Sequence, residues 1–114
     1  MDENCLFCQM IEGTIPVQFR YQDDHCFVIQ DIHPLAPTHL LIIPRTHMTD
    51  LNCSSMDNRQ DLGHLLWICG EMANAEGIGD DGYRVTINKG HNSGQTISHL
   101  HLHLLAGRRL GPEA

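Results

Sequence analysis

Apolar and polar residues alternate along this chain in a pattern typical of short strands with two helices. Apolar residues between positions 6 and 11 recur every three to four residues, which predicts a short helix over residues 5–13. Strands are expected at residues 17–21 and 26–30, with a polar turn signal at residues 22–24 between them. The first third of the chain therefore predicts a helix followed by a hairpin.

The rest of the pattern predicts one long helix between further strands. Strands are expected at residues 39–43, 83–88 and 97–105, and a helix is expected at residues 57–76. A polar, glycine-bearing loop at residues 89–94 precedes the last strand. The buried stripe of the long helix is expected to consist of Leu62, Leu65, Leu66, Cys69, Met72 and Ala73.

The predicted strands outnumber the predicted helices, and the short connections between the strands favour antiparallel pairing. The predicted fold class is therefore α+β, with a five-stranded antiparallel sheet, one long helix and one short helix. A length of 114 residues without a repeat or a linker predicts a single domain over residues 1–114.

Charge and composition narrow the function classes. The net charge is −7 with seven lysines and arginines, so the basic surface typical of a nucleic-acid binder is not expected. No apolar run reaches the length of a membrane span, and the acidic start of the chain does not resemble a secretory signal. An odd number of cysteines, five, suits a reducing compartment, so a cytoplasmic protein is expected.

Nine histidines stand out, and three of them alternate in His99-Leu100-His101-Leu102-His103. In a strand, alternate side chains share a face, so the three histidines are expected on one face with the leucines packed behind. A surface run of histidines is one alternative. A metal site is another, but the first and third histidines would lie roughly 13 Å apart along a strand. That span does not suit a single ion with bonds of about 2 Å.

A nucleophilic histidine explains the central position best. An imidazole can attack phosphorus and form a covalent intermediate, and His101 has histidines on either side to orient it and to donate hydrogen bonds. The loop at residues 88–96 adds backbone N–H groups that could hold charged oxygens, although an ordinary glycine loop has the same composition.

The histidine strand resembles the His-x-His-x-His-x-x signature of the histidine triad family, in which x is apolar. The resemblance covers nearly the whole chain and is closest to the Hint branch of that family. It extends to the blocks at residues 5–8, 12–16, 31–39, 41–44, 94–96 and 106–108.

The resemblance implies a homodimer that binds purine mononucleotides and hydrolyses nucleoside 5′-phosphoramidates without a catalytic cofactor. It implies that His101 is the nucleophile, that His103 and His39 contact the phosphate or the leaving group, and that His99 supports His101 or serves elsewhere. Asp31 would bind the ribose hydroxyls. The phosphate site would consist of Asn88, Gly94, Gln95 and Thr96. The base pocket would consist of Leu6, Phe7, Met10, Ile29 and Leu41, for which simple core packing is the alternative.

Three departures from the family pattern bear on which leaving group the protein prefers. Thr96 stands where serine is common, Ala106 replaces the first glycine of a frequent pair, and the tail carries no tryptophan. A dinucleotide hydrolase or nucleotidyl transferase on the same fold is an alternative, as is a nucleotide-binding scaffold protein. The chain lacks the longer insert expected of the dinucleotide-cleaving relatives, and a scaffold needs no nucleophile.

Cys5-x-x-Cys8 has the spacing of half a zinc site. In family members that carry this pair, His47 and His99 would complete a structural Cys2His2 site; two reduced cysteines without metal are the alternative. The remaining cysteines and histidines are expected to be core thiols or surface residues without a site: Cys26, Cys53, Cys69, His25, His33, His64 and His91.

Overall fold

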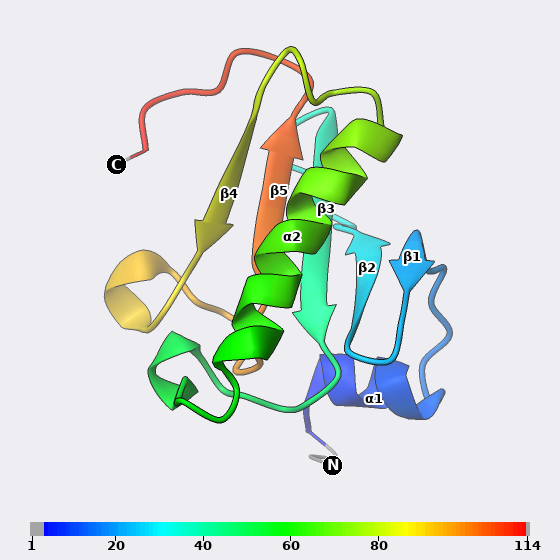
Figure 1. Ribbon diagram of the computed structural model, residues 1–114, viewed down its shortest axis with the longest axis vertical. Helices are drawn as coiled ribbons and strands as arrows, with labels where there is room; N and C mark the ends of the chain where they lie inside the picture. The colour runs from blue at the N-terminus through cyan, green and yellow to red at the C-terminus, as the bar shows by residue number, and fades with distance from the viewer. Residues whose placement is uncertain (1–3, 114) are drawn as a thin grey trace.

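The computed structural model describes residues 4–113 and contains a five-stranded antiparallel sheet with helix α2 lying across one face (Figure 1). The strand order is β1-β2-β3-β5-β4, and the predicted α+β class is confirmed. The elements are α1 (Leu6–Glu12), β1 (Tyr21–Gln22), β2 (Cys26–Gln30), β3 (Thr38–Pro44), α2 (Arg59–Ala75), β4 (Tyr83–Ile87) and β5 (Leu102–Ala106), with short 3-10 turns at Leu51–Cys53 and His91–Ser93. Neither helix within residues 4–113 has the length and apolar character needed to cross a membrane.

Strands β2 and β3 form the centre of the fold because they are buried on both faces. Their pairing places Val28 opposite Ile42, and these side chains pack against α2. The alternate residues, such as Phe27 and Ile43, point to the other face, where they pack against Phe7 of α1. A strand covered on both faces needs an almost continuous apolar run, which is the pattern of this segment.

The first strand is much shorter than the expected residues 17–21. The predicted hairpin is present, but its ladder begins at Tyr21, and only the N–H of Arg20 reaches the neighbouring strand, at the carbonyl of Val28. Residues 15–18 leave the sheet edge and line a cavity instead. Pro16, which has no N–H to donate, suits this departure from the ladder.

The predicted start of the last strand, expected at residues 97–105, also lies too early in the sequence. Strand β5 begins at Leu102 because the backbone before it is bonded elsewhere. The N–H of Leu100 donates to the carbonyl of Met48, and the carbonyl of His99 accepts from the His101 ring. Leu100 and Leu102 are buried as expected, and so is Leu104 after them, but His99 and His101 precede the strand.

Helix α2 lies within the predicted bounds, but one of the residues predicted to be buried along it is exposed. Leu65, Cys69, Met72 and Ala73 are buried, whereas the side chain of Leu66 is 54% exposed. Ile68 takes its place in the core, as its spacing of three from Leu65 allows. The neighbouring Trp67 is also exposed.

We expect Gly107→Ala to lower the free energy of unfolding by about 2–3 kcal/mol. Gly107 has φ +100°, and an added Cβ would lie 2.7 Å from the Cβ of Pro37 and 3.3 Å from the N of Thr38. Urea unfolding of this variant beside Gly111→Ala, whose added Cβ would meet nothing within 4 Å, measures the effect. Equal stability of the two variants would contradict the prediction.

Candidate active site

His101 lies directly before β5, and the hydrogen bond that its ring makes shows which ring nitrogen carries the proton. Its Nδ1 lies 2.7 Å from the carbonyl oxygen of His99, and a carbonyl only accepts, so Nδ1 carries the proton. In the neutral ring the lone pair then resides on Nε2. The ring is 7% exposed and meets the Phe7 ring edge-on at 5.2 Å. The geometry therefore presents an oriented, unprotonated nitrogen, which is what a nucleophilic histidine requires.

A chain of hydrogen bonds fixes the tautomers of His39 and His103 as well. The N–H of Leu35 donates to His39 Nδ1 at 3.1 Å, so His39 carries its proton on Nε2. That N–H lies 2.9 Å from His103 Nδ1 and 3.4 Å from an Asp31 carboxylate oxygen. His103 consequently accepts at Nδ1 and carries its own proton on Nε2. It offers an N–H donor beside His101, with the two rings 5.0 Å apart.

Burial keeps this pair of histidines neutral. Burial, followed by the neighbouring His101 and His39, lowers the pKa of His103 to about 4 against the opposing effect of Asp31. Burial also lowers the pKa of His39, again against the opposing effect of Asp31. At neutral pH both rings are uncharged, which agrees with the tautomers assigned from the hydrogen bonds.

We expect acid to destabilise the protein partly through His103. Above its ordinary pKa of 6.5 neither the folded nor the unfolded chain binds a proton here. As the pH falls toward 4, the unfolded chain binds a proton that the folded chain does not, so stability is lost over this window. For a partly exposed ring we expect about 1–2 kcal/mol. Urea unfolding at both ends of the window should show a smaller loss in His103→Gln than in wild type, and an equal loss would contradict the prediction.

The expected metal ligands come together at the N-terminus of α1. One ligand atom each from Cys5, Cys8, His47 and His99 lies within 4.8 Å of the others. His99 Nδ1 lies 3.2 Å from Cys5 Sγ, and His47 Nδ1 lies 3.2 Å from Cys8 Sγ. His99 Nε2 donates to the carbonyl of Pro44, so its lone pair faces the sulfurs. The donor set and the oriented imidazole fit a tetrahedral zinc ion.

A cavity of about 620 Å³ beside Asp31 contains part of the expected base pocket. Leu6, Met10 and Ile29 line it together with Asp31. Phe7 and Leu41 are outside that lining: both are buried in the core beneath the sheet, and Phe7 packs against the rings of His99 and His101. Their contacts are those of the core, and a place for them in the base pocket stays a prediction.

Residues of the glycine loop hold the loop together by their side chains. Asn88 Nδ2 donates to the carbonyl of Ser93, and Gln95 accepts from the N–H of Gly90. Gln95 Nε2 also donates to two backbone carbonyls, so this side chain is engaged in structure. Gly94 has φ +83°, and Thr96 lines a smaller cavity with Cys5 and Leu6.

Several lining residues of the larger cavity did not emerge from the sequence pattern. Gln30 is the last residue of β2, and the others lie on the irregular segments before β1 and after β2: Ile15, Pro16, Val17, Gln18, Arg20, Ile32 and Pro34. One signal in the sequence could have identified Ile32, because it is an apolar residue next to Asp31 in a loop. In the structure its side chain is 85% exposed.

The fold and the oriented histidines are those of a histidine triad protein. The family model described as "HIT domain" matches residues 12–110. The purine nucleoside phosphoramidase of Escherichia coli K12 is 42% identical over 112 residues, which cover 98% of this chain and 94% of that protein.

Solved structures give the same result. A HIT family hydrolase from Legionella pneumophila has a TM-score of 0.92 at 41% identity, covering 95% of this chain and 96% of its own. A HIT family hydrolase from Clostridium thermocellum has a TM-score of 0.94 at 39% identity, covering 99% and 98%. The chain belongs to the histidine triad (HIT) family, and the resemblance seen in its sequence is confirmed.

Proposed function

We propose that the protein hydrolyses the P–N bond of purine nucleoside 5′-phosphoramidates through a nucleotidyl group carried by His101. The observation that carries this proposal is the hydrogen bond from His101 Nδ1 to the carbonyl of His99, which leaves Nε2 as the attacking atom. The N–H that His103 presents beside it supports the same chemistry. The similarity to the E. coli purine nucleoside phosphoramidase supports the substrate class.

The reaction runs in two displacements at phosphorus. In the first, the Nε2 lone pair of His101 bonds to phosphorus while the P–N bond breaks, and the amine leaves with the bonding electron pair and takes a proton from solvent. In the second, water bonds to phosphorus and loses a proton to solvent, and Nε2 departs with its electron pair. The neutral N–H of His103 stabilises the charge on the phosphoryl oxygens in both steps.

The nucleotide is proposed to lie between the cavity and the histidines. Its base occupies the cavity lined by Leu6, Met10 and Ile29, and its ribose hydroxyls donate to Asp31, whose carboxylate stands between this cavity and His39. Phosphate oxygens meet backbone N–H groups of the loop at residues 88–96, because the side chains of Asn88 and Gln95 are engaged in holding that loop.

A structural zinc ion is part of the proposal. Cys5, Cys8, His47 and His99 would hold it, and their burial suits a closed site. The ion would cross-link the N-terminus of α1, the segment after β3 and the segment before β5. Because the carbonyl of His99 orients His101, the zinc would stabilise the nucleophile's position without taking part in the reaction.

A homodimer built through α2 and β4 is also proposed. Leu66 and Trp67 on α2 are 54% and 58% exposed, and Tyr83 on the outer strand β4 is 43% exposed. Large apolar side chains of this kind are enriched at subunit interfaces.

We expect wild type to sediment as a dimer and Trp67→Glu to sediment as a monomer, because a buried charge would disrupt such an interface. Met56→Glu, at a side chain that is 72% exposed, is the matched control and should remain a dimer. A monomeric wild type, or a dimeric Trp67→Glu, would contradict the proposed interface.

The activity is tested by supplying purified wild type with adenosine 5′-phosphoramidate and, separately, with a diadenosine polyphosphate. We expect release of AMP from the phosphoramidate with a much larger kcat/KM than from the dinucleotide. Preference for the dinucleotide would move the protein to the dinucleotide hydrolases, and mononucleotide binding without turnover of either compound would favour a scaffold.

A further inference from the structure

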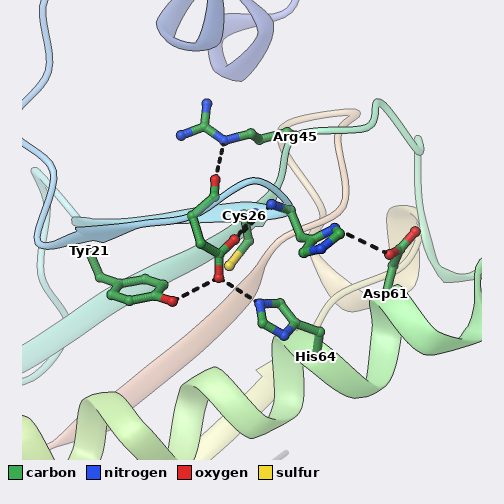
Figure 2. Close-up of polar contacts among 7 residues, drawn as sticks. Tyr21, Cys26, Arg45, Asp61 and His64 are labelled. Atoms are coloured by element: carbon green, nitrogen blue, oxygen red, sulfur yellow. Dashed lines mark hydrogen bonds and ion pairs between the residues drawn. The ribbon is translucent and has the colours of Figure 1, made fainter.

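A second group of metal-binding side chains lies where the β1–β2 hairpin meets α2, on the helix-covered face of the sheet. Cys26 belongs to the core cluster that packs against α2, and the sequence pattern indicated no role for it or for His64 beyond core or surface. In the structure one ligand atom each from Asp23, Cys26 and His64 lies within 4.8 Å of the others. Tyr21 and His64 point toward the same carboxylate from the hairpin and from the helix (Figure 2).

The carboxylate of Asp23 is held in position by the hairpin itself. One oxygen accepts the backbone N–H groups of His25 and Cys26, at 2.7 and 2.8 Å. The other oxygen lies 2.8 Å from the Tyr21 hydroxyl and 2.7 Å from His64 Nε2. Metal-binding carboxylates are commonly oriented by such hydrogen bonds, which order the ligand before the metal binds.

The spacing Asp23-x-x-Cys26 reproduces the geometry of the cysteine pair at α1. There the N–H of Cys8 donates to Cys5 Sγ at 3.4 Å, three residues back. Here the N–H of Cys26 donates to Asp23 in the same way. Two-residue spacers of this kind place both ligand atoms on one side of a turn, which is why they recur in zinc sites.

The three side chains offer the kinds of ligand atom that suit a metal ion of intermediate softness, such as Zn²⁺. A thiolate, an imidazole and a carboxylate are all zinc ligands, and a thiolate disfavours magnesium or calcium. Burial, followed by the nearby Asp23 carboxylate, raises the pKa of the Cys26 thiol to about 12, so without metal the thiol keeps its proton. The side chains of His64 and Asp23 are 25% and 21% exposed, so an ion can reach the site from solvent and keep a water ligand.

We propose that Asp23, Cys26 and His64 form a second site for Zn²⁺, separate from the cluster at α1. Binding would release the Cys26 thiol proton to solvent and move the His64 proton from Nε2 to Nδ1, which frees Nε2 for the metal. Water would complete four ligands. The ion would join the hairpin to α2, and the alternative role for the same residues is a hydrogen-bonded link that holds no metal.

Metal content of the full-length protein after dialysis against buffered Zn²⁺ tests the site. We expect Cys26→Ser and His64→Gln each to hold one zinc ion fewer per chain than wild type. Cys69→Ser and His25→Gln, a buried thiol on α2 and an exposed histidine in the hairpin, are the matched controls and should hold as many as wild type. His64→Gln alters a partly exposed side chain, so it keeps the test valid if Cys26→Ser does not fold.

Co²⁺ provides a second readout, because a thiolate bound to cobalt produces a charge-transfer absorption. We expect the double variant Cys5→Ser with Cys8→Ser, which removes both thiols of the cluster at α1, to retain this absorption through Cys26. Adding His64→Gln to that double variant should weaken or abolish it. Equal zinc content in wild type and folded His64→Gln would overturn the proposal and leave the residues as a hydrogen-bonded link. Neither measurement depends on phosphoramidate turnover, so the result stands whatever the enzyme's substrate.

Discussion

Replacing His101 with alanine is expected to lower the turnover of adenosine 5′-phosphoramidate by about three orders of magnitude or more. The substitution removes the nitrogen that bonds to phosphorus, and neither neighbouring histidine can replace it. His99 directs its lone pair at the cysteine sulfurs, and the His103 nitrogen toward the site carries a proton. Steady-state release of the amine, measured beside the thermal stability of the variant, gives the effect on chemistry.

Two comparisons separate loss of the nucleophile from loss of structure. His25→Ala removes an exposed histidine from the β1–β2 hairpin, away from the motif, and should turn over like wild type. His101→Gly leaves space at the same position, so added imidazole should restore part of the rate. A folded His101→Ala that keeps more than about a tenth of the wild-type rate would rule out His101 as the nucleophile.

Replacing Cys8 with serine is expected to lower the free energy of unfolding of the zinc-loaded protein by about 3–5 kcal/mol. Cys8 is completely buried, and its sulfur lies 3.2 Å from His47 Nδ1 and 3.7 Å from His99 Nδ1. Loss of one thiolate would remove the ion that joins α1 to the segments around β3 and β5. Urea unfolding in buffered Zn²⁺ measures the change.

Cys53→Ser provides the control, because that thiol is exposed on a 3-10 turn. We expect it to unfold like wild type. Chelation of the metal should leave the rate of phosphoramidate hydrolysis intact at temperatures where the protein stays folded. Equal stability of Cys8→Ser and wild type in zinc would show that the cluster holds no structural ion, and a chelated enzyme that is folded but inactive would give the metal a catalytic role.

The central part of the fold was predictable because its physical signals are local. Residues 26–30 and 39–43 are apolar runs bounded by turn signals, and they form β2 and the middle of β3. Gly13 ends α1 with φ 80°, as a helix-stopping glycine does. The long helix differed by two residues at its start and one at its end, within the usual fraying of helix boundaries.

The histidine motif was predictable as a site, but its geometry was not. Alternation predicts three histidines on one face of a strand, which holds only where the backbone is in the ladder. The carbonyl of His99 is bonded to the His101 ring, and the N–H of Leu100 is bonded to Met48, so the strand begins later. The bond between Leu100 and Met48 joins distant segments of the chain, and no local pattern encodes it. The same is true of the link between Asp23 and His64.

The stereochemistry at phosphorus distinguishes a nucleotidyl group on His101 from direct attack by water. A nucleoside phosphoramidate with one phosphoryl oxygen replaced by sulfur, and of one configuration at phosphorus, can be hydrolysed in water enriched in oxygen-18. Two displacements through His101 each invert the configuration at phosphorus, so we expect net retention of configuration in the labelled product. Net inversion would mean that water attacks the substrate directly and would contradict a nucleotidyl group on His101.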